Sequence, residues 1–220
     1  MTTGKYKEIL NRVHLSENRV VADMLRNSGL KYKTIFGVNI VHLRDIAKDF
    51  APDHNLAMEL WEKDIREMKI LSLLIDNPNE ITLEQMDQQV TTFNNPELIE
   101  QACYKTYPRV PFALEKAMTY CQHPSGYINA TGFTLIAKIA QLKQFENERV
   151  FIPFLALIPK KGEHANIYLR RSIATALRLL AKVSDTMKKE CTIVAKKLKM
   201  KNTTASVWIA EEVLFELEDF

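Results

Sequence analysis

Basic side chains recur along one helical face in the last third of the chain. Arg171, Thr175, Arg178 and Lys182 are separated by four, three and four residues, which places them in one line on a helix. Exposed Arg and Lys side chains in such a line neutralise phosphates without reading the base sequence. The residues predicted to contact nucleic acid are Arg170, Arg171, Thr175, Arg178, Lys182, Lys188, Lys189, Lys196 and Lys197.

The charges are unevenly distributed, although the net charge is only +3. Residues 160–201 contain 12 basic and 3 acidic residues, whereas residues 45–101 contain 4 basic and 13 acidic ones. A solvated helix face explains most runs of charge, but this density of cations favours a polyanion-binding surface. The acidic stretch 211–220 is interpreted as a terminal helix, or as a segment that folds back on the basic face and competes with nucleic acid.

The elements that position these residues are predicted to be helices. The chain has only six glycines among 220 residues, and apolar residues recur at helical spacing almost throughout. Paired short helices without a linker predict one all-α domain over residues 1–220, an α–α superhelix (solenoid) of HEAT-like helical repeats. The predicted helices cover residues 16–27, 38–51, 53–61, 65–75, 82–90, 95–107, 111–121, 129–145, 165–183, 184–200 and 203–218.

Local signals predict where several helices begin and end. Gly29 is suited to the left-handed conformation that follows a helix, and Thr82 with Gln85 forms a capping-box pattern. Residues 160–162 are expected to form a loop, because Pro153 and Pro159 interrupt the preceding segment. The side chains expected to cap helix starts are Asp53, Thr82, Asn129, Ser184 and Thr203.

Residues 60–76, LWEKDIREMKILSLLID, change from a charged cluster to an apolar run. This change is typical of two packed helices joined by a turn at Lys63 and Asp64. Trp61 is expected to fill the core, and so is Trp208, since both lie among apolar neighbours. Glu62 and Arg66 are four residues apart and are expected to pair locally, which contributes about a few tenths of a kcal/mol where such a pair is exposed.

The sequence contains no motif that implies a metal or cofactor. The five histidines lack the spacing of metal ligands, and no G-x-S-x-G, H-E-x-x-H or Walker motif occurs. Three widely spaced cysteines favour reduced thiols over disulfides. No signal peptide or membrane-spanning run is apparent. We therefore expect a cytoplasmic monomer that binds no metal, no cofactor and no membrane.

Three blocks of sequence resemble the AlkD-like DNA alkylation repair family of the HEAT-like repeat DNA glycosylase superfamily. FGVNIVHLRDIAKDF and LAMELWEKDIREMKILSLLI match the family pattern through Gly37, Val38, Leu43, Arg44, Ile46, Ala47, Lys48, Leu60, Trp61, Arg66 and Glu67. RRSIATALRLLAK matches a later helix through Ile173, Leu177, Arg178 and Lys182. The resemblance implies a basic concave groove that holds duplex DNA, damaged or branched, and in active members hydrolysis of the glycosidic bond of alkylated purines.

This chain departs from the family pattern at the positions that carry the chemistry. Where active members have a Trp followed four residues later by an Asp, the chain has Pro96 and Glu100. The family arginine falls at Thr134 or Leu135, and a second Trp falls at Thr175. Glu100 is therefore the only candidate catalytic residue, and its simplest interpretation is an exposed acidic residue on a short helix.

Three functions follow from this comparison. A carboxylate can stabilise the positive charge that develops on the sugar during glycosidic cleavage, but the aromatic faces that would hold a cationic lesion are missing. A binding-only homologue is therefore favoured over an alkylpurine DNA glycosylase. The alternative from another class is a HEAT-repeat scaffold that binds proteins and has no role on DNA.

Overall fold

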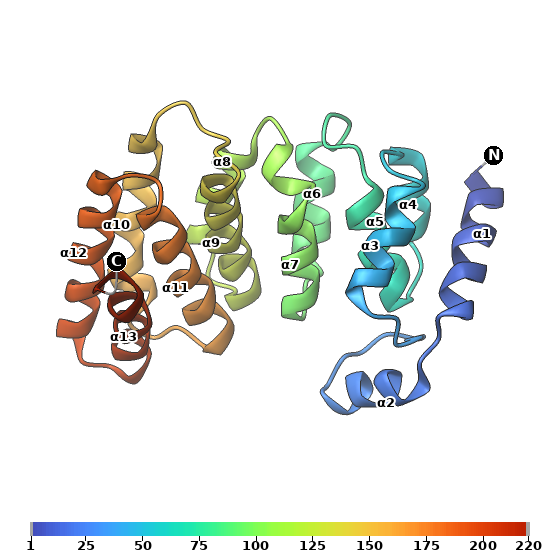
Figure 1. Cartoon of the computed structure of the whole chain (residues 1–220), viewed down its shortest axis with the longest axis horizontal. Helices are drawn as coiled ribbons and strands as arrows, with labels where there is room; N and C mark the ends of the chain where they lie inside the picture. The colour runs from blue at the N-terminus through green and yellow to red at the C-terminus, as the bar shows by residue number, and fades with distance from the viewer. Residues whose placement is uncertain (1, 219–220) are drawn as a thin grey trace. The chain divides into compact units, whose positions relative to one another are not determined.

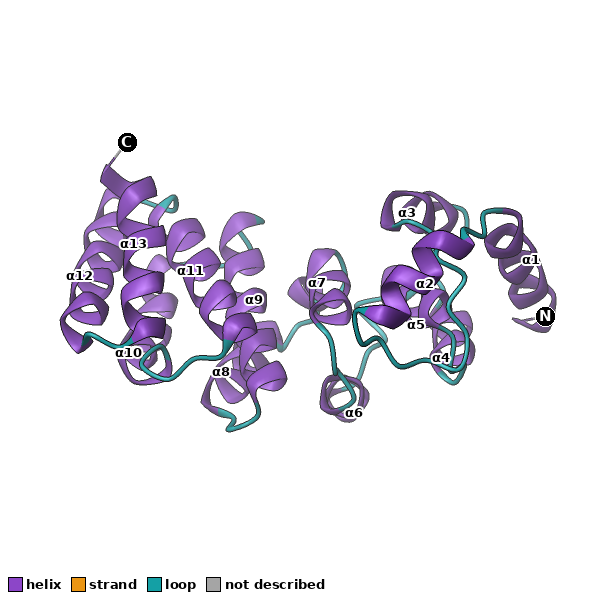
Figure 2. Cartoon of the chain, turned by 90° about the horizontal axis from the view of Figure 1, so that it is seen from below, coloured by secondary structure: helices purple, strands orange, loops and turns teal. Residues whose placement is uncertain are grey.

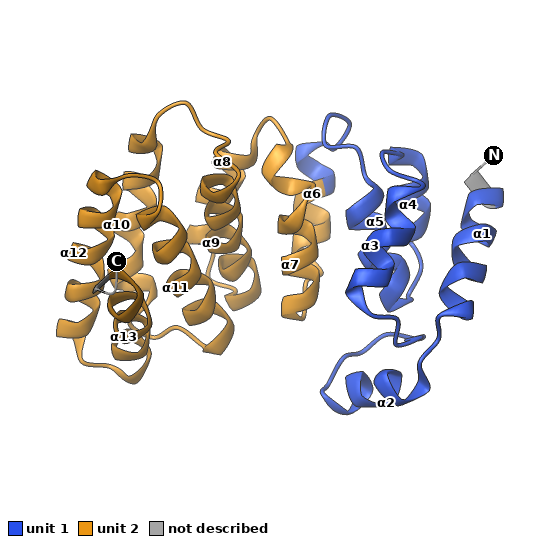
Figure 3. Cartoon of the chain, in the orientation of Figure 1, with its two compact units in different colours: residues 1–85 blue, residues 86–220 orange. Residues whose placement is uncertain are grey.

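Helices form nearly all of the regular structure in the computed structural model, which describes residues 2–218. Within that range no β-strand forms, and one isolated parallel bridge joins Thr34 and Ile65. The predicted all-α class is therefore confirmed. The chain divides into two compact units, residues 1–85 and 86–220 (Figure 3). The single domain over residues 1–220 stays a prediction.

Unit 1 contains five complete helices (Figure 1). The first, α1, was not predicted from the sequence. Helix α5 packs against α3 and α4, and α1 also contacts α3 and α4. The unit boundary lies within α6 (Leu83–Thr91). The helices of unit 1 are α1 (Thr2–Leu15), α2 (Arg19–Asn27), α3 (Ile40–Lys48), α4 (His54–Trp61) and α5 (Arg66–Ile75).

Unit 2 consists of helices in two layers (Figure 2). Helices α9, α11 and α13 lie side by side in one layer, and α8, α10 and α12 lie in the other. Helix α9 packs against α8, and α13 packs against α12, which is the pairing expected of helical repeats. The helices are α7 (Pro96–Tyr104), α8 (Ala113–Gln122), α9 (Gly126–Gln141), α10 (Ile152–Lys161), α11 (Ile167–Ala181), α12 (Asp185–Lys201) and α13 (Thr204–Glu218), with 3-10 turns η1 (Tyr107–Arg109) and η2 (Glu148–Phe151).

A buried carboxylate anchors the segment before α3 to the start of α5. The Glu67 side chain is fully buried and accepts hydrogen bonds from the backbone N–H groups of Phe36, Gly37 and Val38 at 3.0–3.3 Å. The Arg66 guanidinium donates to Glu67 at 2.7 Å and to the Val38 carbonyl at 3.0 Å. These bonds satisfy backbone donors that the extended segment leaves without partners of its own.

Arg66 does not have the exposed position that a surface pair with Glu62 requires. Arg66 is only 3% exposed, because its guanidinium points inward to Glu67. Gly37 permits this arrangement, since its φ is 75° and a Cβ there would lie 2.2 Å from the Asn18 carbonyl oxygen. The predicted turn before α5 and the burial of Trp61 are both confirmed.

Most of the predicted helix caps are confirmed. Asp53 accepts from the Leu56 N–H at 3.0 Å, Ser184 from Met187 at 3.1 Å and Thr203 from Ser206 at 3.2 Å. Gly29 has the expected positive φ of 98°. Thr82 accepts from the Gln85 N–H at 3.1 Å, but the Gln85 side chain donates to Asp76 instead of returning to Thr82. The capping box is therefore only half formed.

Asn129 does not cap a helix start, and this prediction is wrong. It lies inside α9 and is buried, and its amide nitrogen donates to the carbonyls of Cys121 and His123, both at 2.7 Å. Those carbonyls belong to the end of α8, whose last carbonyl groups lack partners within their own helix. Asn129 therefore caps the end of the preceding helix.

Residues 160 and 161 lie in α10, so the loop predicted for residues 160–162 is wrong. Pro153 occupies the first turn of α10, where a missing N–H costs no helical hydrogen bond. Pro159 lies inside the helix near its end. Burial of Phe154, Leu155 and Ile158 stabilises α10 despite this second proline.

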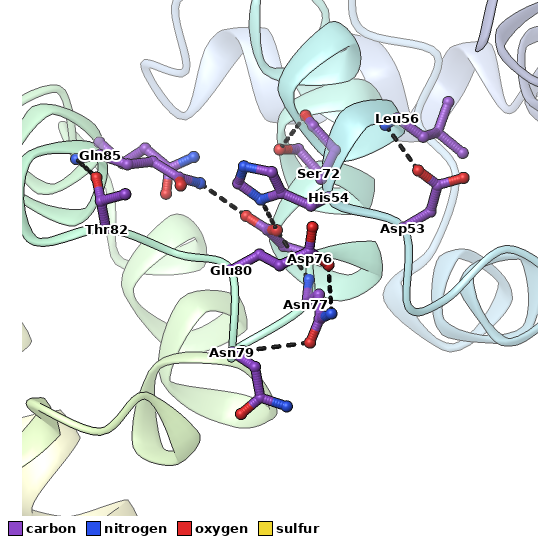
Figure 4. Close-up of polar contacts among 12 residues, drawn as sticks. Asp53, His54, Leu56, Ser72, Asp76, Asn77, Asn79, Glu80, Thr82 and Gln85 are labelled. Atoms are coloured by element: carbon purple, nitrogen blue, oxygen red, sulfur yellow. Dashed lines mark hydrogen bonds and ion pairs between the residues drawn. The ribbon is translucent and has the colours of Figure 1, made fainter.

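A buried carboxylate, Asp76, connects the starts of α4 and α6 to the end of α5 (Figure 4). His54 Nδ1 lies 2.8 Å from one oxygen of Asp76, and the Gln85 amide donates to the other oxygen at 2.8 Å. The Asn77 N–H also donates to Asp76, which is 3% exposed. Burial raises the pKa of Asp76 above its ordinary value of 3.8, while the hydrogen bond from His54 opposes that rise.

This raised pKa predicts how stability depends on pH. The folded protein holds the Asp76 proton more tightly than the unfolded chain, so the contribution of Asp76 to stability is complete below pH 3.8 and is lost as pH rises through the folded pKa. Over that window, wild type is expected to lose stability relative to Asp76→Asn. Urea unfolding of both proteins, with the exposed Asp64→Asn as control, measures the difference. A difference between wild type and Asp76→Asn that does not change with pH contradicts the prediction.

Candidate nucleic-acid interface

A cavity of about 120 Å³ opens in unit 2 where α7, α9 and α11 meet. The capping residues Asn95 and Asn166 set the starts of α7 and α11 by accepting backbone N–H groups at 2.9–3.1 Å. The polar and aromatic lining comes from all three helices, together with Pro96 at the start of α7. The lining residues that bear on chemistry are Pro96, Glu100, Thr134, Tyr168, Arg171 and Ser172.

This cavity collects several positions that the family resemblance identified. Pro96, Glu100 and Thr134 all line it. Leu135, the other position considered for the family arginine, is fully buried in the core. Thr175 does not line the cavity; it is half-buried on α11, where its hydroxyl accepts from Arg178 at 3.4 Å. The chain therefore presents a carboxylate and a hydroxyl together at this place.

An arginine contributes positive charge to the same cavity. Arg171 is exposed and, within residues 2–218, forms no ion pair. Glu100 is also exposed, as the simplest interpretation of the sequence predicted. A guanidinium beside a carboxylate can bind a phosphate oxygen while the carboxylate faces the adjoining sugar. The hydroxyls of Thr134 and Ser172, 3.1 Å apart, add neutral hydrogen-bonding groups.

An aromatic ring lines the cavity, and sequence reasoning missed it. Tyr168 lines the cavity and stacks on Tyr127 of α9, with ring centroids 5.1 Å apart and planes inclined by 29°. Desolvation and the hydrogen bond with Tyr168 raise the pKa of Tyr127. Tyr168 lies seven residues before Thr175, two helical turns away on the same face. That spacing could have indicated an aromatic side chain close to the missing tryptophan.

A carboxylate from the last helix binds two of the predicted DNA-binding cations. Glu216 of α13 lies 3.3 Å from Arg178 Nη1 through one oxygen and 2.6 Å from Lys182 Nζ through the other. The hydrogen bond from Lys182 holds the pKa of Glu216 below its ordinary value, with Arg178 assisting. Residues 204–218 thus form the predicted terminal helix and also fold back on the basic face.

The other predicted cations do not gather at the cavity. The Arg170 guanidinium lies 4.8 Å from the centre of the Trp208 ring and forms a cation–π contact with it. Trp208 is only half-buried, so its prediction as a core residue is wrong. The predicted lysines of α12 lie in the opposite layer of unit 2 from α11 (Figure 2). These are Lys188, Lys189, Lys196 and Lys197.

The described residues contain few other groups suited to catalysis. Burial raises the pKa of all three cysteine thiols, that of Cys191 to about 12, so none is an available nucleophile. Residues 2–218 hold no group of three or more His, Cys, Asp and Glu side chains placed to bind a metal ion. In the same range, no helix has the length and apolarity required to cross a bilayer.

Solved structures of two other proteins are similar to this chain. One structure belongs to a protein described as a member of a new family related to the HEAT-like repeat DNA glycosylases with affinity for branched DNA structures. It is 15% identical, the match covers 97% of this chain and 96% of that chain, and the TM-score is 0.76. A designed armadillo repeat protein matches at 12% identity over 90% of this chain and 99% of its own, with a TM-score of 0.41.

Comparison with protein families identifies the family to which the chain belongs. No curated protein sequence matches it significantly. Residues 17–206 match the family model described as DNA alkylation repair enzyme, which confirms the resemblance noted in the sequence. The fold class is confirmed as well, since the similar structure is a HEAT-like repeat protein. The chain therefore belongs to the DNA alkylation repair enzyme family and has its all-α solenoid of HEAT-like repeats.

Proposed function

We propose that the protein binds DNA through the face of unit 2 that carries the cavity between α7, α9 and α11. The observation that carries this proposal is that Arg171, Glu100 and the stacked Tyr168 all line this one cavity. Among the described residues, Arg171 forms no ion pair. The guanidinium binds a backbone phosphate, and the tyrosine ring offers a surface on which an unstacked base can lie.

Damaged or branched DNA suits this combination better than intact duplex. Both contain nucleotides that have lost part of their stacking, and such nucleotides expose the base faces that aromatic side chains bind. Membership of the DNA alkylation repair family supports a DNA partner. So does the similar structure, whose protein is described as having affinity for branched DNA structures.

We infer that binding, rather than glycosidic cleavage, is the principal activity. Glu100 supplies the carboxylate that base excision requires, but Pro96 and Thr175 leave the two tryptophan positions of active members without an aromatic ring. A protein-interaction scaffold remains the alternative from another class. The acidic segment over residues 45–101 is the feature that favours it.

Replacing Arg171 with alanine tests the binding proposal. We expect about a tenfold weaker affinity for branched or duplex DNA at low salt, because one charge-assisted phosphate contact is lost. The slope of log affinity against log salt should fall by about one. Fluorescence anisotropy with labelled DNA at several salt concentrations measures both quantities.

Lys199→Ala is the matched control, since it removes one exposed cation from α12, in the opposite layer of unit 2. Equal losses in both variants would mean that general charge, and not the cavity face, governs binding. The same samples, prepared with DNA that carries a methylated purine, report base release. We expect none above a protein-free sample; release that disappears in Glu100→Gln would instead assign glycosylase activity to this site.

A further inference from the structure

Both oxygens of a single carboxylate are bound by cations on the face of α11. Glu216 reaches Arg178 and Lys182 from α13, at 3.3 and 2.6 Å. The position of α13 is set by apolar packing, since Ile209, Ala210 and Val213 are fully buried. Glu216 itself is 25% exposed, and Lys182 is 54% exposed. The ion pairs are therefore reached by water and can exchange with dissolved anions.

The arrangement of these charges corresponds to a phosphate site. A phosphodiester presents two unesterified oxygens that share one negative charge, as a carboxylate does, and Arg and Lys are its usual partners. Arg178 lies on α11, and Lys182, four residues later, directly follows the last residue of that helix, so both continue the helical face of Arg171. A DNA strand bound at Arg171 and running along α11 meets these two cations next.

We propose that Arg178 and Lys182 form a phosphodiester-binding site that Glu216 of the last helix occupies in the free protein. This proposal rests on the proposed function of the cavity face. DNA that follows α11 beyond Arg171 displaces Glu216, so the carboxylate competes with the backbone phosphate and lowers the affinity for DNA. The last helix thereby limits binding to DNA that is already held at the cavity.

Glu216→Gln in the full chain tests this competition, because the amide keeps the shape of the side chain and removes its charge. We expect DNA affinity at low salt to rise about fivefold, since two partly exposed ion pairs no longer oppose binding. Glu211→Gln is the matched control. It makes the same charge change at an exposed residue of α13 that lies about 140° around the helix from Glu216.

A second background separates local competition from general charge. In a chain that already carries Arg178→Gln and Lys182→Gln, adding Glu216→Gln is expected to leave DNA affinity unchanged. Thermal unfolding of each variant without DNA shows whether Glu216 serves only to hold α13 on α11. A lower melting temperature with no gain in affinity would overturn the proposal in favour of that structural role.

The remaining outcomes distinguish this proposal from the proposed function. Equal affinities for Glu216→Gln and Glu211→Gln, with binding still dependent on Arg171, overturn the competition and leave the cavity face as the DNA site. Binding that appears only in Glu216→Gln supports the competition. Absence of DNA binding in every variant overturns both proposals together.

Discussion

Glu67→Ala is expected to lower the free energy of unfolding by about 3–5 kcal/mol, because it leaves a buried guanidinium without its counter-charge. Glu67 is 0% exposed and Arg66 is 3% exposed, so water cannot replace the lost carboxylate. Three backbone N–H groups, those of residues 36–38, lose their acceptor at the same time. Urea unfolding followed by circular dichroism measures the change.

Two further variants identify the source of this effect. Glu8→Ala removes an exposed glutamate from α1 and is expected to change stability by less than about 0.5 kcal/mol. Glu67→Gln keeps an acceptor for the backbone donors but removes the charge, so its loss should lie between the other two. A Glu67→Ala protein as stable as Glu8→Ala would show that the segment before α3 does not depend on this carboxylate.

Gly132→Ala is expected to lower the free energy of unfolding by about 3 kcal/mol, at the upper end of the usual cost of overpacking. A Cβ at Gly132 would lie 2.5 Å from the Cys121 backbone nitrogen, 2.8 Å from its Sγ and 2.9 Å from the Ala117 carbonyl oxygen. Two of these atoms are helix backbone, so α9 must move away from α8.

The same movement should weaken DNA binding, because α9 supplies Thr134 to the cavity. Gly4→Ala provides the control: a Cβ there meets no atom within 4 Å, and alanine favours the helix. Its stability should equal or exceed that of wild type. If Gly132→Ala is as stable as Gly4→Ala and binds DNA normally, the close approach of α8 and α9 is not what positions the cavity.

The residues that reveal the family in the sequence act mainly on the fold. Gly37, Val38, Arg66 and Glu67 belong to the family pattern, and all four take part in the buried connection between the segment before α3 and α5. That connection needs a glycine with positive φ and a buried charge pair, which few other residues can supply. The pattern therefore identified the architecture more firmly than the chemistry.

The site was only partly predictable from the sequence. Glu100 and Thr134 were placed by the resemblance, and the structure brings them to one cavity. Tyr127 lies 41 positions before its stacking partner Tyr168. Glu216 lies 38 positions after Arg178 and 34 positions after Lys182, the two cations that it binds. No spacing rule covers such separations, because they depend on how three helices pack.

The sequence by itself determined the features whose causes lie within one helical turn. The helix class, the caps at Asp53 and Ser184 and the left-handed Gly29 follow from apolar periodicity and from side chains that bond three residues ahead. Only the tertiary structure decided the partners of Arg66, Asn129 and Glu216. Each has at least one partner from another segment: the Val38 carbonyl for Arg66, the end of α8 for Asn129, and Arg178 with Lys182 for Glu216. Sequence alone does not reveal such partners, because packing decides which polar groups are desolvated together.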